Sequence, residues 1–254
     1  MYKGHHIAVV VPIHNEEEHL EGAIARIPGY VDFIVAVDDG STDGTWETLC
    51  RLDDRRLIKL RHRENSGVGA ATKTGYLHAL QTEADLVAVM DGDGQMDGSD
   101  LEHLVEAAAQ GVDYVKGNRF LDRKTIGRMP WGRYIGNRVL SWLTRQASGF
   151  ANSLDAQCAF TVVRRQALAR IDLMRLYDRY GFPNEMLFAV LRIGLTVECP
   201  AVKTIYGGEV SGINPFLTVP TVLWLIGRGF LRRKTARSAV SVLKTSEARG
   251  GTGD

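Results

Sequence analysis

The amino-acid sequence predicts an α/β fold in which helices flank a mostly parallel central sheet. Two observations support this prediction. Short apolar segments that suit buried strands alternate with amphipathic segments through the first half of the chain, and acidic residues gather directly after two of these apolar segments. Such alternation is typical of parallel sheets, whose strands are covered by helices on both faces. The chain has 254 residues, of which 44% are hydrophobic, so it can bury the core of one large domain.

The predicted elements follow one another in a regular order. The segment IAVVVPI (Ile7–Ile13) is uniformly apolar, as expected for a strand that is buried on both faces. The next strands are predicted at 33–39, 56–62, 84–91 and 112–120, and the helices between them at 16–27, 43–52, 69–80 and 99–110. Ser99 or Asp100 is a suitable N-cap for the last of these helices. Residues 155–168 are typical of a strand that leads into a helix, and residues 180–194 of a further helix.

Polar residues follow three of the predicted strands. They occupy positions 12–16, 38–41 and 91–97. The carboxyl ends of parallel strands meet at one edge of a sheet, and ligands of such sheets bind at that edge. We therefore expect these three segments to lie together and to form a binding site.

The densest acidic cluster lies in the stretch LVAVMDGDGQMDGSD, from residue 86 to residue 100. Its aspartates repel one another unless a positive group lies among them. An EF-hand loop counted from Asp91 fits poorly, because Met96 stands where that loop has glycine and Gln95 stands at another ligand position. Turn chemistry alone would explain one Asp-Gly pair. It explains less well a second pair, Asp38 and Asp39, at the end of another strand.

A site for Mg²⁺ or Mn²⁺ is the interpretation that we favour for this cluster. These ions prefer carboxylate oxygens and keep positions open for water and phosphate. Asp91 and Asp93, which Gly92 separates, can place one carboxylate on the ion and leave the other to contact a sugar or a metal-bound water. The diphosphate of a nucleotide would supply further oxygen ligands, and the ion would neutralise the charge on a departing diphosphate.

The composition argues against other classes of protein. The net charge of +1 gives no overall electrostatic reason to expect a nucleic-acid partner. The cysteines, Cys50, Cys158 and Cys199, are scattered and odd in number, which fits a reducing compartment. The N-terminal sequence lacks the pattern of a secretory signal, and no apolar run reaches the roughly 18 residues of a membrane span. We therefore expect a cytoplasmic protein.

Five motifs in register carry a resemblance to a known family. VVVPIHNEEEHL, VDDGSTDGT, NSGVGAATKTG, VMDGDGQMDGSDL and KGNRF occur in this order. Together they resemble the nucleotide-sugar half of family 2 glycosyltransferases, which have the GT-A fold, and MDGDGQMD is similar to the DxD motif of that family. The later segments DAQCAFTVVRRQAL, GFPNEMLFAVLRIG and IYGGEVSGINP resemble, more narrowly, polyprenyl-phosphate sugar synthases, including dolichol-phosphate mannose synthases. The resemblance covers roughly residues 7–234.

The resemblance implies a nucleoside site at the first two strand ends. Pro12, His14 and Glu16 match the element that frames the base and the ribose in the family. His14 stands in place of the usual tyrosine, and an imidazole can still stack on a base. Val37 and Asp39 match the positions that line the base and hydrogen-bond to it.

The resemblance also implies the diphosphate and metal site. Asp91, Gly92 and Asp93 match the DxD triplet, with Asp93 as the stronger metal candidate, and Gln95 matches a position close to the metal or the phosphates. Arg119 matches an arginine that contacts phosphate, for which a guanidinium group is well suited.

Two departures from the family pattern concern the acceptor side. Ala159 stands where relatives often have glycine beside the acceptor. Val210 stands where a basic residue would be expected to contact a phosphate, and Lys203 is a possible substitute for that contact.

Glu185 is the candidate for a general base. A sugar hydroxyl acceptor would need a carboxylate to remove its proton, whereas the oxygen of a lipid phosphate is already anionic at neutral pH. The sequence leaves open whether Glu185 is a base, an orienting group or the cap of a helix.

The C-terminal part predicts a contact with a membrane surface. An apolar stretch with Trp224 and Phe230 is followed by a basic one, an order that suits a helix lying in the interface of anionic lipid. A plain helix that packs on the domain is the alternative. The aromatic and arginine-rich residues 128–150 could form a second contact. We accordingly divide the chain into a nucleotide-sugar half at 1–120, an acceptor half of the same domain at 121–212, a membrane-associating segment at 213–240 and a tail at 241–254 that is expected to be disordered.

These features predict an inverting glycosyltransferase that moves a hexose from GDP-mannose or a UDP-hexose to polyprenyl phosphate. It would work at the inner face of the membrane, with Mg²⁺ or Mn²⁺ as cofactor and with a membrane protein as a possible partner. Two alternatives stay open. One is transfer to a saccharide hydroxyl with Glu185 as base, and the other is a non-catalytic module that binds nucleotide sugars.

Overall fold

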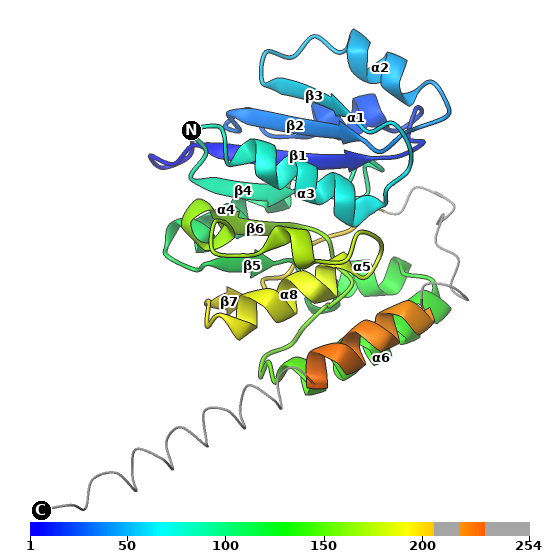
Figure 1. Ribbon diagram of the computed structural model, residues 1–254, viewed down its shortest axis with the longest axis vertical. Coiled ribbons are helices and arrows are strands. Elements are labelled where there is room, and N and C mark those ends of the chain that lie inside the picture. The colour runs from blue at the N-terminus through cyan, green and yellow to red at the C-terminus, as the bar shows by residue number, and fades with distance from the viewer. Residues whose placement is uncertain (206–218, 232–254) are drawn as a thin grey trace, which may run out of the picture.

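The computed structural model describes residues 1–205 and 219–231, in which helices cover both faces of a central sheet (Figure 1). Across these residues the sheet has seven strands in the order β3-β2-β1-β4-β6-β5-β7. The strands are β1 Ile7–Ile13, β2 Phe33–Asp38, β3 Leu57–Arg61, β4 Leu86–Val89, β5 Tyr114–Lys116, β6 Thr161–Arg164 and β7 Val197–Glu198. The expected tail at 241–254 and the positions 213–218 and 232–240 of the membrane-associating segment lie outside the described residues, as does Val210.

The prediction of a mostly parallel sheet is confirmed, with one exception. β1 pairs in parallel with β2 and β4, β2 with β3, and β5 with β7. β6 is antiparallel to both of its neighbours, β4 and β5. β6 therefore runs opposite to the other strands, and it joins a strand from the second half of the chain to the sheet of the first half.

The helices form a layer on each side of this sheet. They are α1 Leu20–Ala25, α2 Thr45–Arg51, α3 Val68–Ala79, α4 Leu101–Ala109, α5 Arg123–Arg128, α6 Trp131–Ser148, α7 Arg165–Leu168 and α8 Phe182–Arg192, with short 3₁₀ turns at Gly98–Asp100, Arg119–Leu121 and Leu173–Arg175. A further helix occupies residues 219–231. None of the helices in these described segments is both long and apolar enough to cross a membrane.

The alternation of side chains along β1 explains the two halves of the core. Ala8 and Val10 pack with α3, α7 and α8 on one face, and Val9 and Val11 pack with α1, α2 and α4 on the other. Successive side chains of a strand point to opposite faces, so a strand between two helix layers must be apolar throughout. All of β1 is buried for this reason.

The start of α4 differs in detail from the prediction. Asp100 does occupy its N-cap position, but its side chain makes no capping hydrogen bond. That carboxylate accepts a hydrogen bond from the backbone N–H of Lys203 instead. Asp97 caps the preceding 3₁₀ turn, where its side chain accepts from the backbone N–H of Ser99 at 2.9 Å.

A small satellite core joins the last described helix to α6. Val222 and Ile226 of helix 219–231 pack with Ala147 of α6, and Phe188 of α8 packs against this cluster. In Figure 1 this helix, drawn in orange, lies beside α6. The two helices therefore form one unit below the sheet.

Candidate active site

A cavity of about 820 Å³ lies at the edge where β1, β2 and β4 end. Most of the predicted site residues line it: Pro12, His14, Glu16, Asp39, Asp91, Gly92, Asp93, Gln95, Arg119 and Lys203. Val37 and Glu185 do not line it. The expectation that the segments after these strands meet at one edge is thus confirmed.

The backbone explains how these segments come together. The N–H of Asp39 donates to the carbonyl of Ile13 at 2.7 Å, and the N–H of Gly92 donates to the carbonyl of Pro12 at 3.3 Å. A Cβ atom on Gly92 would lie 3.1 Å from Cγ1 of Ile13, which is a tight contact. A glycine between the two aspartates therefore lets their loop run close along the end of β1.

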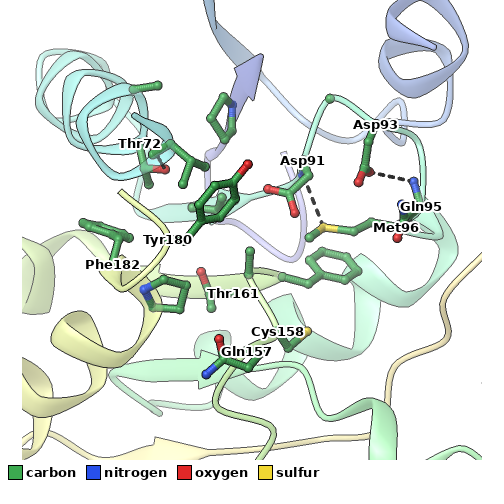
Figure 2. A pocket seen from close by; sticks show the side chains of 18 of the residues that line it. Thr72, Asp91, Asp93, Gln95, Met96, Gln157, Cys158, Thr161, Tyr180 and Phe182 are labelled. Atoms are coloured by element: carbon green, nitrogen blue, oxygen red, sulfur yellow. Dashed lines mark hydrogen bonds between the residues drawn. The ribbon is translucent and has the colours of Figure 1, made fainter. Parts of the chain in front are cut away.

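Asp91 and Asp93 bring negative charge to the wall of the cavity. Burial raises the pKa of Asp91 to about 7, with a further contribution from the negative charge of Asp93. The side chain of Asp91 lies beside Met96 and Tyr180, while a carboxylate oxygen of Asp93 accepts a hydrogen bond from the N–H of Gln95 at 2.9 Å (Figure 2). A raised pKa means that the surroundings disfavour the second negative charge, so a cation is the natural complement of this pair.

The donor set fits a Mg²⁺-type ion that also binds a ligand. Within residues 1–205 and 219–231, no group of three or more His, Cys, Asp or Glu side chains is arranged to hold a metal. Mg²⁺ commonly takes one or two carboxylates from the protein and the rest of its ligands from water and phosphate. Asp91 and Asp93 match that requirement, whereas a structural metal held by protein ligands alone would need more of them.

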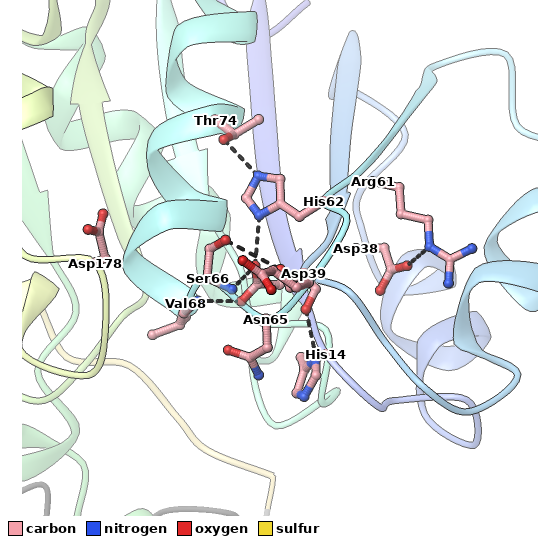
Figure 3. Close-up of polar contacts among 12 residues, drawn as sticks. His14, Asp38, Asp39, Arg61, His62, Asn65, Ser66, Val68, Thr74 and Asp178 are labelled. Atoms are coloured by element: carbon pink, nitrogen blue, oxygen red, sulfur yellow. Dashed lines mark hydrogen bonds and ion pairs between the residues drawn. The ribbon is translucent and has the colours of Figure 1, made fainter.

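Asp39 organises one part of the cavity wall (Figure 3). One of its carboxylate oxygens accepts from a ring nitrogen of His62 at 2.7 Å and from the N–H of Ser66 at 3.0 Å. The other accepts from the N–H of Gly67 at 2.7 Å. Asp39 therefore fixes the loop between β3 and α3 at the cavity. His62 had no predicted role, and the signal for one was its position at the end of a predicted strand.

One hydrogen bond to the backbone determines the orientation and the tautomer of the His14 ring. Its Nδ1 lies 2.9 Å from the backbone carbonyl oxygen of Asp39. Because a carbonyl oxygen can only accept, Nδ1 must carry the hydrogen. In the neutral ring, Nε2 is then left as an acceptor on a side chain that lines the cavity.

Arg119 forms a buried ion pair that was not expected. Its Nε and Nη2 donate to the two carboxylate oxygens of Asp155 at 2.6 and 3.0 Å. This bidentate geometry fixes the plane of the guanidinium group at the cavity wall. Beside it, the buried Lys116 donates to the carbonyl oxygen of Cys158 and so helps to hold the loop that contains Asp155. The position of Asp155 before a strand gave no signal of this pairing.

α6 supplies another part of the cavity wall. Arg133 and Asn137, one helical turn apart, line it together with Gln157 and Tyr180. Arg133 belongs to the stretch 128–150 that was expected to form a second membrane contact, whereas Asn137, Gln157 and Tyr180 had no predicted role. The available signal was the spacing of Arg133 and Asn137, which places both on one face of the helix.

The structure does not bring Val37 to the site. Its side chain is 0% exposed and belongs to the core on the side of α3. The alternation along β2 turns Val37 to that face, because Val35, two positions earlier, packs there too. The expectation that Val37 lines a base is therefore corrected.

Glu185 is also placed away from the cavity. It lies in the first turn of α8, is 4% exposed, and pairs with Arg228 of helix 219–231. Of the three roles that the sequence left open, this position favours an orienting role over that of a base. Lys203 does reach the cavity, where its ammonium group lies 3.5 Å from the carboxylate of Asp100.

Comparisons with known proteins agree with this geometry. The model of the family described as glycosyl transferase family 2 matches residues 8–172. A UDP-N-acetylglucosamine–dolichyl-phosphate N-acetylglucosaminyltransferase of Methanococcus voltae is 27% identical over 216 residues, which cover 79% of this chain and 86% of the relative. A polyprenol monophosphomannose synthase of Mycolicibacterium smegmatis is 27% identical over 195 residues, which cover 74% and 73%.

A solved structure extends the comparison to the fold. Glucosyl-3-phosphoglycerate synthase from Mycobacterium tuberculosis, in complex with UDP, matches with a TM-score of 0.64 at 21% identity, covering 91% of this chain and 80% of that one. The same synthase has been crystallised with Mn²⁺ or with Mg²⁺ in the presence of UDP. The parallel sheet, the acidic edge and the match over residues 8–172 lead to one conclusion: this chain is an enzyme of the family 2 glycosyltransferases, with the GT-A fold.

Proposed function

We propose that this enzyme transfers a hexose from a nucleotide diphosphate sugar to polyprenyl phosphate at a membrane surface. One observation carries the proposal. A single cavity is lined both by the acidic residues that follow the strands and by Arg133 and Asn137 of α6. A donor and an anionic acceptor can therefore meet in it.

The donor side of the cavity suits a nucleotide diphosphate sugar. His14 and the loop fixed by Asp39 offer hydrogen-bonding groups for the nucleoside. Asp91 and Asp93, with Gln95 beside them, would hold Mg²⁺ or Mn²⁺ together with the diphosphate. The bound ion would neutralise charge on the departing diphosphate. Arg119 and Lys203 add positive charge at the same wall.

The acceptor side suits a phosphate group. Arg133 and Asn137 can donate hydrogen bonds to phosphate oxygens, and they belong to the helix whose outer face is aromatic. The two relatives described above are named for transfer to dolichyl phosphate and for polyprenol monophosphomannose synthesis, which supports a lipid phosphate in this place.

The proposed chemistry needs no general base. A phosphate oxygen is already anionic at neutral pH, so the removal of a proton is not part of its attack. That agrees with the position of Glu185, which pairs with Arg228 and does not line the cavity. Attack from the side opposite the departing diphosphate would invert the anomeric carbon.

The surface around the cavity supports a membrane-bound acceptor. α6 turns an apolar stripe outward, in which Trp131 is 76% exposed and Trp142 is 57% exposed. Trp224 of the adjacent helix 219–231 is 58% exposed. Exposed aromatic side chains along the face of a helix suit the lipid interface, and arginines nearby suit anionic headgroups. We propose that the enzyme works at the inner face of the membrane.

Transfer of radiolabel into lipid tests the proposal directly. Purified protein is incubated with Mn²⁺, polyprenyl phosphate and labelled GDP-mannose, UDP-glucose, UDP-galactose or UDP-N-acetylglucosamine, with Asp93→Ala as control. Butanol-extractable counts that vanish in the control would support the reaction and identify the donor. Nucleotide binding without such counts from any donor would contradict it and favour a saccharide acceptor or a non-catalytic role.

A further inference from the structure

The loop at 176–181, which leads into α8, is held tightly against the start of α3. The N–H of Ala70 donates to the carbonyl oxygen of Asp178 at 2.9 Å. A Cβ atom on Gly69 would lie 2.4 Å from the carbonyl oxygen of Tyr177, so only glycine permits this approach. The loop therefore presents its side chains from a fixed backbone.

Tyr180 extends from this loop into the cavity. In Figure 2 its ring lies across the space between Phe182 and Asp91, with the hydroxyl group directed away from the loop. The residue is 45% exposed. Among the side chains and backbone groups of residues 1–205 and 219–231, none forms a hydrogen bond with this hydroxyl group. The hydroxyl group of Tyr180 can therefore form a hydrogen bond with a ligand in the cavity.

The hydroxyl group of Tyr180 can donate a hydrogen bond in these surroundings. Burial raises the pKa of Tyr180, and the negative charges of Asp91 and Glu16 raise it further. A tyrosine has an ordinary pKa of about 10, so the phenol is protonated at neutral pH and can donate a hydrogen bond. Carboxylates such as those of Asp91, Asp93 and Glu16 can only accept when ionised. A sugar hydroxyl can donate to a carboxylate and accept from a phenol at the same time.

The position of Tyr180 identifies the part of the ligand that it meets. It lies beside Asp91 after the end of β4, in the cavity that Gln157 and the α6 residues Arg133 and Asn137 also line. In the proposed function the diphosphate lies at the carboxylates and the acceptor at α6, so the hexose that moves between them must occupy this space.

We propose that Tyr180 is a positioning residue for the transferred sugar, and that its hydroxyl group donates a hydrogen bond to a hydroxyl oxygen of the hexose. This inference rests on the proposed function. It implies that Tyr180 contributes to the binding of the nucleotide sugar but not to the binding of the nucleotide diphosphate alone.

Tyr180→Phe removes the hydroxyl group and keeps the ring. Calorimetric titrations in Mn²⁺ compare UDP with UDP-glucose and GDP with GDP-mannose. We expect the Kd of the preferred nucleotide sugar to rise about three- to tenfold, as for the loss of one neutral hydrogen bond, while the Kd of the matching nucleotide stays unchanged. Tyr177→Phe, on the same loop but not lining the cavity, is the matched control and should change neither value.

Two results would overturn the inference. Equal weakening of the nucleotide and the nucleotide sugar would make Tyr180 a nucleotide contact, and no change in either would show that its hydroxyl group is not used. If the wild-type protein binds none of the four compounds, the proposed function fails and this inference fails with it, which is a different result from the first two.

Monodeoxy analogues of the preferred donor provide a second test. The effect of Tyr180→Phe should disappear for the analogue that lacks the partner hydroxyl and persist for the others, as in a double-mutant cycle. The same penalty with every analogue would contradict a hydrogen bond to the sugar.

Discussion

Glu185 in the first turn of α8 and Arg228 in helix 219–231 form an ion pair whose carboxylate is almost completely buried. The guanidinium group of Arg228 also lies 4.7 Å from the ring centre of Trp224. Since Trp224 is exposed, this pair connects the surface that we propose to meet the membrane with the helix that follows the loop of Tyr180.

We predict that Glu185→Gln lowers stability more than activity. A buried ion pair that loses one partner leaves the other charge uncompensated, and because Arg228 is partly exposed we expect a loss of about 1–3 kcal/mol in the free energy of unfolding. Urea denaturation measures this loss. Lipid-phosphate transfer should continue at a reduced rate, in contrast to Asp93→Ala. Complete loss of transfer in a folded Glu185→Gln protein would contradict this prediction and favour a role for Glu185 as a general base.

A double-mutant cycle measures the interaction between Glu185 and Arg228 separately from their contacts with other residues. Arg228→Met alone should destabilise the protein, and Glu185→Gln combined with Arg228→Met should cost less than the sum of the two single changes, because no buried charge remains unpaired. Additive losses would show that the two side chains do not stabilise each other.

We predict that Asp155→Asn impairs both stability and transfer. It removes the carboxylate that fixes the buried guanidinium group of Arg119, so a loss of about 3–5 kcal/mol is expected. Transfer by any remaining folded protein should fall at least tenfold. Asp172→Asn is the control, because its ion pair with Arg175 is largely exposed and should contribute about 0–1 kcal/mol. Thermal unfolding and initial rates measure both effects, and equal behaviour of the two variants would exclude a special role for Asp155.

The raised pKa of Asp91 predicts how stability depends on pH in the absence of metal. With its pKa raised to about 7, Asp91 keeps a proton in the folded protein that the unfolded chain releases above about pH 4. Folded-state stability should therefore decrease as the pH rises from about 4 to 7, by at most about 4 kcal/mol, because each unit of pKa difference contributes about 1.4 kcal/mol. Urea denaturation in EDTA measures this decrease, and Asp91→Asn should remove most of it.

The same pKa predicts the pH dependence of metal binding. The proton on Asp91 must leave before its carboxylate can bind a cation, so the increase in Tm caused by Mn²⁺ should be larger at pH 8 than at pH 6. Asp93→Ala should reduce the increase at both values. An effect of Mn²⁺ that is independent of pH and unaffected by Asp93→Ala would place the ion elsewhere.

We predict that the exposed tryptophans of α6 bind the membrane surface. Trp131→Glu combined with Trp142→Glu replaces interfacial rings by charges that anionic lipid repels, so binding to vesicles that contain phosphatidylglycerol should weaken at least tenfold. Co-sedimentation measures the change. Met174→Glu is the matched control, because Met174 is an exposed apolar residue outside α6 and helix 219–231. Equal vesicle binding by both variants would count against this surface.

The sequence alone predicted the sheet and one edge of the site. Apolar strands alternate with amphipathic helices in β1 to β4, and this local pattern is sufficient to imply parallel pairing and a common edge for the strand ends. Asp91, Asp93 and Asp39 follow their strands directly. Their meeting therefore depended only on the register of neighbouring strands, which buried apolar strands specify strongly.

Only the tertiary structure decided which residues far apart in the sequence pair with each other and which side chains reach the cavity. The partners Arg119 and Asp155 are 36 positions apart, and Arg228 and Glu185 are 43 positions apart, so no local periodicity relates them. The direction of a side chain also depends on packing, which turned Val37 into the core and Tyr180 into the cavity. Strand order follows from short-range patterns that repeat along the chain. The wall of a cavity forms where segments distant in the sequence pack together, so each contact depends on the positions of both segments.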